Sequence, residues 1–226
     1  MTEKALVLFS GGQDSTTCLA KALSDYNGAI TTIGFDYGQR HAVELEQAKI
    51  IANLAGVPFT IIDMTLLSKL TQNALTRNTI PIESKDGELP NTFVDGRNHM
   101  FISVAAIYAK QQGISHLITG VCETDYSGYP DCRQDFIHSL NHTLNLAMDT
   151  SFVIHTPLMH LTKAETVLLM DSLGRLDWYK ESHTCYEGMR PACGKCPACK
   201  LRLKGFEEAG ISDPLAYETT VSEVPG

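Results

Sequence analysis

The most constraining feature of the chain is a short apolar segment that runs directly into a glycine-containing turn and a helical pattern. Residues 5–9 are apolar, residues 10–15 read Ser-Gly-Gly-Gln-Asp-Ser, and a helix is expected immediately afterwards. A strand, tight turn and helix in this order aim backbone N–H groups at one point, at the positive end of the helix. The two glycines carry no side chain that would keep an anion from the backbone, and the serines add hydroxyl donors. The segment therefore predicts a phosphate or nucleotide site.

Apolar and amphipathic segments alternate along the next 150 or so residues, a pattern typical of an α/β protein with a doubly wound parallel sheet. Thr162 followed by Glu165 is a capping-box pattern that predicts a helix start. Residues 76–95 interrupt the alternation and are expected to form a loop excursion, either a lid or a surface insertion. The expected strands are 5–9, 30–35, 59–62, 116–121 and 152–155, and the expected helices after the first are 41–54, 97–112, 135–148 and 162–173.

Length, composition and charge limit the class of protein. At 226 residues with 43% apolar content, the chain is long enough for one large domain. We expect a domain at 1–175 and a small segment with a tail at 176–226. There is no long apolar run for a membrane span, and the first strand begins so early that we expect no signal peptide and a cytoplasmic protein. A net charge of −8 favours small-molecule chemistry over nucleic-acid binding.

Four of the seven cysteines lie close together near the C-terminus. Cys193, Cys196 and Cys199 have C-x₂-C-x₂-C spacing, and Cys185 lies upstream. Four thiolates so close together suit one tetrahedral structural zinc ion per chain, Zn²⁺. An iron–sulfur cluster and a redox-active cysteine pair are the alternatives.

Several polar segments follow the other expected strands, where ligands of a parallel sheet bind. Residues 35–41 read Phe-Asp-Tyr-Gly-Gln-Arg-His, and residues 120–133 are rich in carboxylates, tyrosines and glycines. Carboxylates of this second segment are suited to the N–H groups of a guanine-like edge, and Arg133 to a substrate carboxylate. Arg97 begins a helix that can receive an anion, and Lys163 is placed to neutralise phosphate charge. The alternatives are a plain polar turn at 35–41, a polar loop at 120–133 and a solvated helix lysine at Lys163.

The Ser10–Ser15 turn differs from a Walker loop and from the G-x-G-x-x-G fingerprint, but it resembles the SGGxDS signature of the PP-loop ATP pyrophosphatases. The resemblance implies a sheet of the PP-loop (adenine nucleotide alpha hydrolase-like) type, with a small C-terminal zinc-binding segment here. It also implies that the protein binds ATP, adenylates its substrate and releases pyrophosphate. The ATP-binding residues expected on this basis are Phe9, Ser10, Gly11, Gly12, Gln13, Asp14, Ser15, Thr16, Thr17, Cys18, Leu19, Asp36, Tyr37 and Gln39.

Nearly the whole chain resembles the 7-cyano-7-deazaguanine synthase family of queuosine biosynthesis, through residues 10–15, 35–40, 96–98, 120–133, 156–158, 163–165 and the four clustered cysteines. The resemblance implies a homodimeric ligase that converts 7-carboxy-7-deazaguanine and free ammonia into the nitrile preQ0, through an adenylated carboxylate and an adenylated amide. Magnesium is expected with ATP, and Asp14 is a candidate for contact with it. The resemblance implies Asp14, Ser15 and Lys163 as catalytic residues, and Arg97, Asn98, Glu123, Asp125, Tyr126, Asp131 and Arg133 as substrate-binding residues.

Two other functions are weighed against this expectation. Another PP-loop enzyme, such as a tRNA-modifying thiolase, is the nearer alternative, because Cys122 and Cys132 lie in a segment expected on the ligand face. A basic surface for RNA is not indicated by the net charge of −8. A zinc-dependent binding module without catalysis is the alternative from another class, and it leaves the Ser10–Ser15 turn unexplained.

Overall fold

The computed structural model describes residues 3–27, 29–39, 43–77, 79–82, 89–124 and 128–218. Within them, five parallel strands form one sheet in the order β3-β2-β1-β4-β5. The strands are β1 (Ala5–Leu8), β2 (Ile30–Asp36), β3 (Phe59–Asp63), β4 (His116–Ile118) and β5 (Val153–His155). The order reverses at β1, so the chain moves outward first to one edge and then to the other, which confirms the doubly wound α/β prediction.

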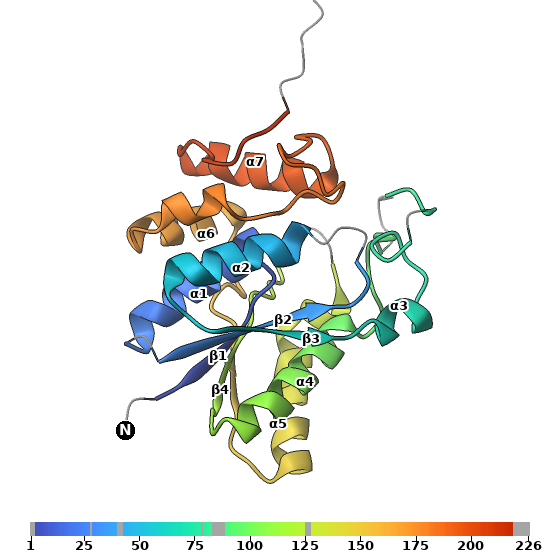
Figure 1. Cartoon of the computed structure of the whole chain (residues 1–226), viewed down its shortest axis with the longest axis vertical. Coiled ribbons are helices and arrows are strands. Elements are labelled where there is room, and N and C mark those ends of the chain that lie inside the picture. The colour runs from blue at the N-terminus through green and yellow to red at the C-terminus, as the bar shows by residue number, and fades with distance from the viewer. Residues whose placement is uncertain are drawn as a thin grey trace, which may run out of the picture.

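Helices cover both faces of the sheet (Figure 1). On one face lie α1 and α2, with α6 and α7 stacked beyond them, and on the other lie α4 and α5. None of the helices within the described ranges is both long enough and apolar enough to cross a membrane. The helices are α1 (Gln13–Asp25), α2 (Val43–Ala55), α3 (Leu66–Leu70), α4 (Arg97–Gln111), α5 (Gln134–Met148), α6 (Lys163–Ser172) and α7 (Pro197–Ala209).

Alternation of side chains along the central strand divides the core into two layers. Ala5 and Val7 of β1 pack with α1, α2 and α6, whereas Leu6 packs with α4 and α5. All three are fully buried. The central strand is therefore apolar throughout, as expected for a strand covered on both faces.

The fourth strand is shorter than the expected 116–121. β4 ends at Ile118, although the N–H of Thr119 still donates to the carbonyl of His155 at 3.0 Å. At Gly120 the backbone passes over the start of α1, where an added Cβ would lie 3.2 Å from the backbone of Asp14. This close approach ends the strand and directs the following residues over the Ser10–Ser15 turn.

The expected loop excursion at 76–95 contains no helix or strand in its described parts, 76–77, 79–82 and 89–95. One hydrogen bond joins it to α3, since Arg77 Nη2 donates to the Ser68 carbonyl at 2.6 Å. Another closes the excursion on itself, since Asn91 Nδ2 donates to the Pro81 carbonyl at 2.8 Å. A role as a lid stays a prediction.

The C-terminal segment packs on the rest of the chain through its own buried residues. Trp178, Tyr179 and Phe206 belong to the same hydrophobic cluster as β1 and α1. Arg202 of α7 is fully buried and forms a two-pronged ion pair with Asp213, with Nε–Oδ2 at 2.7 Å and Nη2–Oδ1 at 2.8 Å. The proposed division at 175/176 stays a prediction, because both parts share this core.

We expect Arg202→Met to lower the free energy of unfolding by about 3–5 kcal/mol, because it leaves the Asp213 carboxylate buried without its cation. Urea denaturation measures the loss. Arg175→Met is the matched control: the Arg175 guanidinium is exposed, 5.1 Å from the Trp178 ring centre, and its removal is expected to cost about 1 kcal/mol or less. Equal losses in the two variants would contradict a specific contribution of the buried Arg202–Asp213 ion pair to stability.

Candidate active site

The turn between β1 and α1 is closed by hydrogen bonds among its own residues. Ser15 Oγ lies 3.1 Å from Ser10 Oγ and donates to the Gly12 carbonyl at 3.2 Å. The N–H of Ser10 donates to Ser15 Oγ at 3.3 Å. Gly12 is the N-cap residue of α1, so the first N–H groups of the helix, which have no partner within it, face this turn. The result is a concave backbone surface suited to a phosphate.

Gly11 leaves room for a neighbouring helix, whereas the sequence predicts that it leaves room for an anion. Its φ is +77°, and an added Cβ would lie 2.7 Å from the backbone nitrogen of Ala48 and 2.9 Å from the carbonyl oxygen of Glu44. The missing side chain therefore lets α2, rather than an anion, approach the turn. Gly11 fixes the position of the phosphate surface relative to α2.

We expect Gly11→Ala to weaken binding of Mg-ATP by about tenfold or more, because the backbone clash and the left-handed conformation together cost on the order of 1–3 kcal/mol. Isothermal titration measures the affinity. Gly113→Ala is the control, since Gly113 has φ +64° and no atom within 4 Å of an added Cβ. The control is expected to lose about 1 kcal/mol of stability and to keep the wild-type affinity. Loss of ATP affinity in both variants alike would contradict the role of Gly11.

Asp14 and Lys163 meet beside the turn. Lys163 Nζ lies 2.6 and 2.7 Å from the two carboxylate oxygens of Asp14, although the residues are 149 positions apart. α7 packs directly on the lysine, because an added Cβ on Gly205 would lie 2.6 Å from the Cβ of Lys163. Thr162 and Glu165 form the predicted capping box and fix the start of α6. A cation is thereby held at the N-terminus of α1.

A cavity of about 350 Å³ opens from the turn along the carboxyl ends of β1, β2 and β4. The amide group of Gln13 in its wall is buried, and within the described ranges neither its nitrogen nor its oxygen has a hydrogen-bond partner. Because a buried unpaired amide is costly, this group fits a polar ligand at the turn. The expected ATP-binding residues in the lining are Phe9, Ser10, Gly12, Gln13, Asp14, Ser15, Tyr37 and Gln39.

The remaining expected ATP-binding residues support the turn without lining the cavity. Cys18 and Leu19 are fully buried in the core, and Thr16 donates to the Gly12 carbonyl at 2.8 Å. Thr17 shares a hydrogen bond with Tyr179. Asp36 accepts from the N–H of Gly38 at 3.1 Å and stabilises the turn after β2. Their direct contact with ATP stays a prediction.

Aromatic rings form one wall of the cavity. The rings of Phe35 and Phe101 stack with centres 4.3 Å apart, and the Tyr37 ring lies 5.5 Å from that of Phe101. Burial raises the pKa of Tyr37 to about 12, so its phenol is neutral. The guanidinium of Arg97 lies 5.9 Å from the centre of the Tyr37 ring. A flat heterocycle with a polar edge suits this wall.

Two of the three carboxylates expected to bind substrate accept hydrogen bonds at helix starts. Glu123 accepts from the N–H of Gln134 at 2.6 Å and so caps α5, and Asp131 accepts from the N–H of Asn98 at 3.1 Å and so caps α4. Neither lines the cavity, and the exposed Arg133 does not line it either. Asp125 and Tyr126 lie outside the described residues. Of the expected substrate-binding set, Arg97 and Asn98 line the cavity.

Glu44, in the first turn of α2, is a cavity residue that the sequence did not single out. Burial raises its pKa to about 7, although the nearby Arg97 lowers it. Arg97 stands in the first turn of α4, on the opposite face of the sheet. The first turns of α2 and α4 thus bring a carboxyl group and a guanidinium group to the same cavity. One sequence signal could have identified Glu44: it is an acidic residue just after the segment 35–41, which is expected on the ligand face.

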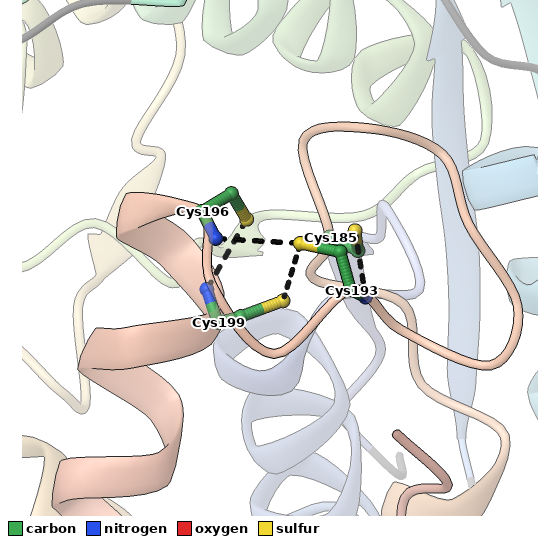
Figure 2. A group of neighbouring side chains, drawn as sticks. All are labelled: Cys185, Cys193, Cys196 and Cys199. Atoms are coloured by element: carbon green, nitrogen blue, oxygen red, sulfur yellow. Dashed lines mark hydrogen bonds between the residues drawn. The ribbon is translucent and has the colours of Figure 1, made fainter. Parts of the chain in front are cut away.

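The four clustered cysteines converge at the start of α7 (Figure 2). Their sulfurs all lie within 4.8 Å of one another, and those of Cys193 and Cys199 are 3.9 Å apart. Tetrahedral zinc with Zn–S bonds of about 2.3 Å would place its sulfurs about 3.8 Å apart. Backbone N–H groups point at three of the sulfurs, as in metal knuckles. The cluster can therefore hold a metal ion, and its geometry fits zinc.

The cysteine segment also reaches the cavity. The N–H of His183 donates to the Gly11 carbonyl at 2.9 Å, and His183 Nε2 lies 3.0 Å from the carbonyl oxygen of Cys185. Tyr186, next in sequence to Cys185, lines the cavity together with His183 and Thr184. Metal binding at the cysteines would thus fix one wall of the cavity and the back of the nucleotide turn.

Comparison with known proteins gives a family match over most of the chain. The family described as queuosine biosynthesis protein QueC matches residues 4–210. A curated relative from Bacillus subtilis (strain 168), named 7-cyano-7-deazaguanine synthase, is 60% identical over 208 residues, which are 91% of this chain and 94% of the relative.

Solved structures are more distant. An NH3-dependent NAD synthetase from Campylobacter jejuni has a TM-score of 0.47 at 13% identity and covers 77% of this chain and 65% of its own. A protein from Methanocaldococcus jannaschii, described as a predicted subunit of tRNA methyltransferase, has a TM-score of 0.48 at 18% identity. The match covers 97% of this chain and 94% of that protein. Likeness at these scores carries no functional inference, so the family assignment rests on the sequence matches.

Proposed function

The chain belongs to the QueC family of queuosine biosynthesis proteins, and we propose that it is an ATP-dependent enzyme that forms 7-cyano-7-deazaguanine from 7-carboxy-7-deazaguanine and ammonia. The observation that carries the proposal is one cavity in which a phosphate-binding turn, the Asp14–Lys163 pair and an aromatic wall face one another. The turn suits ATP and the wall suits a flat heterocycle.

The chemistry requires two activations because a carboxylate is a poor electrophile. A carboxylate oxygen attacks the α-phosphorus of ATP, the bond to the β-phosphate oxygen breaks, and pyrophosphate leaves. Ammonia attacks the resulting acyl carbon, AMP leaves and a proton is lost, which gives the amide. The amide oxygen then attacks a second ATP, again with loss of pyrophosphate and a proton. Elimination of AMP and one more proton forms the nitrile.

Residues of the chain are placed to assist the phosphoryl steps. The N–H groups at the start of α1 and the hydroxyl groups of Ser10 and Ser15 would hold the phosphates. Lys163 would neutralise charge that develops on the departing pyrophosphate, and Asp14 would orient the lysine until ATP arrives. Arg97 and Asn98 would contact the heterocyclic substrate from the start of α4.

Two metal ions are part of the proposal. Zinc would be held by the four cysteines and would stabilise the C-terminal segment without taking part in the reaction. Magnesium would accompany ATP and neutralise its phosphates, with Asp14 as the protein carboxylate nearest the turn. The proposal also includes a cytoplasmic homodimer that acts on small molecules, which the acidic balance of 26 Asp and Glu against 18 Lys and Arg supports over RNA.

Pyrophosphate exchange tests the activation step by itself. Labelled pyrophosphate is expected to enter ATP only when 7-carboxy-7-deazaguanine and magnesium are present, because exchange requires a reversible adenylation of that carboxylate. Omission of ammonium should leave exchange intact. Exchange that depends on added tRNA instead would favour a tRNA-modifying enzyme, and ATP binding without any exchange would favour a binding module.

A further inference from the structure

The cavity contains one acidic side chain that the proposed steps do not use. Among the described residues that line the cavity, the carboxylates are those of Asp14 and Glu44. Asp14 is engaged by Lys163 at 2.6 Å, whereas Glu44 has no hydrogen bond or ion pair from its carboxylate to any residue in the described ranges. Because a half-buried carboxylate is poorly solvated, it favours a ligand that donates hydrogen bonds.

The surroundings of Glu44 define the kind of ligand. Its neighbours in the lining include the rings of Tyr37 and Tyr186 and the guanidinium of Arg97. Glu44 comes from α2 and Arg97 from α4, so a carboxylate and a guanidinium cation enter the cavity from helices on opposite faces of the sheet. Although burial raises the pKa of Glu44 to about 7, the nearby Arg97 guanidinium and N–H donors of a ligand favour its ionised form. A flat ring that carries adjacent N–H donors on one edge matches this carboxylate, which when ionised only accepts hydrogen bonds.

We propose that Glu44 is the specificity-determining residue for the guanine-like edge of the substrate, an inference that rests on the proposed function. Its carboxylate accepts from the ring N1–H and the exocyclic 2-amino group. Glu123 and Asp131 do not line the cavity, and each accepts a hydrogen bond from the N–H of a helix start. Glu44 is therefore a binding residue that selects for the 2-amino group, away from the reacting carboxylate.

The test compares two ligands on wild type and Glu44→Gln, in the presence of magnesium and a non-hydrolysable ATP analogue. The ligands are 7-carboxy-7-deazaguanine and its 2-desamino analogue, and titration calorimetry gives both dissociation constants. Loss of a hydrogen bond to a charged acceptor weakens binding by about 10- to 100-fold, so wild type should prefer the amino compound by that factor. In Glu44→Gln the preference should fall to about threefold or less, because the amide oxygen alone replaces two acceptors.

Glu46→Gln is the matched control on the same helix. Glu46 is exposed and pairs with Lys49 at 2.8 Å, so this variant should keep the wild-type preference. Glu44→Asp retains a carboxylate with a shorter reach and should keep a preference above that of Glu44→Gln. Catalytic selectivity, as the ratio of kcat/KM for the two compounds, gives the same comparison if calorimetric binding is too weak.

The outcomes separate this inference from the proposed function. A wild-type preference that persists unchanged in Glu44→Gln overturns the role of Glu44, as does a fall in kcat alone with both affinities intact, which would indicate a general base. If the wild-type protein neither binds the carboxylate compound nor converts it, the proposed function itself fails.

Discussion

Replacing Lys163 by methionine is expected to lower the rate of adenylation by about 10²- to 10³-fold, the usual effect of removing one preorganised group that stabilises charge in the transition state. Lys163 Nζ is held at 2.6 Å from Asp14 beside the Ser10–Ser15 turn, and the side chain is only 11% exposed. The methionine keeps most of the side-chain volume beneath Gly205, so the effect should be on rate rather than on folding. Pyrophosphate release in a single turnover measures it.

Lys21→Met controls for loss of a lysine ion pair. Lys21 pairs with Asp25 at 2.6 Å farther along the same helix as Asp14, but this pair is on the surface and does not line the main cavity. Its removal is expected to leave adenylation unchanged. Asp14→Asn should share much of the loss seen in Lys163→Met, because the lysine would no longer be oriented. Normal turnover in Lys163→Met and Asp14→Asn would contradict the assignment of this pair to catalysis.

Replacing Cys196 by serine is expected to remove the bound metal and to lower the melting temperature by about 8–16 °C. This figure takes a loss of about 4 kcal/mol, typical when a structural metal is lost, at about 2–4 °C per kcal/mol for a chain of this size. Cys196 is the N-cap residue of α7 and one of the four clustered cysteines (Figure 2). Elemental analysis and calorimetry measure the two effects.

Cys132→Ser is the control for this variant. Cys132 lies near Asn98, far along the chain from the cluster, and its substitution should leave metal content and melting temperature at wild-type values. Because Tyr186 and His183 join the cluster to the cavity, Cys196→Ser should also weaken substrate binding. Unchanged metal content in Cys196→Ser would show that the cluster is not the metal site. Iron in place of zinc would favour the iron–sulfur alternative.

Much of the fold could be predicted because its signals are local. The apolar strand at Ala5–Leu8, the turn and the helix that follows are consecutive in sequence, and the Thr162–Glu165 capping box spans one turn. The spacing of Cys193, Cys196 and Cys199 likewise predicted a metal site, and the structure brings their sulfurs together with that of Cys185. Each of these features depends on residues within a few positions of one another.

The site was harder to predict because its contacts are long-range. Nothing in the sequence around Gly11 shows that α2 packs against it, so its role in packing was missed. The carboxylates of Glu123 and Asp131 had the right chemistry for substrate binding, but only the tertiary structure shows that both cap helices. Glu44 was missed for the converse reason: as an acid in the first turn of a helix, it looks like an ordinary surface residue.

The proposed function is measured directly by the conversion of 7-carboxy-7-deazaguanine by the purified protein with magnesium, ATP and ammonium, followed by mass spectrometry. We expect the nitrile, together with two AMP and two pyrophosphate per nitrile, because both the carboxylate and the amide are adenylated. ADP and phosphate in place of AMP and pyrophosphate would contradict the adenylation chemistry. Intact ATP and no nitrile from folded, metal-loaded protein would contradict the proposed function.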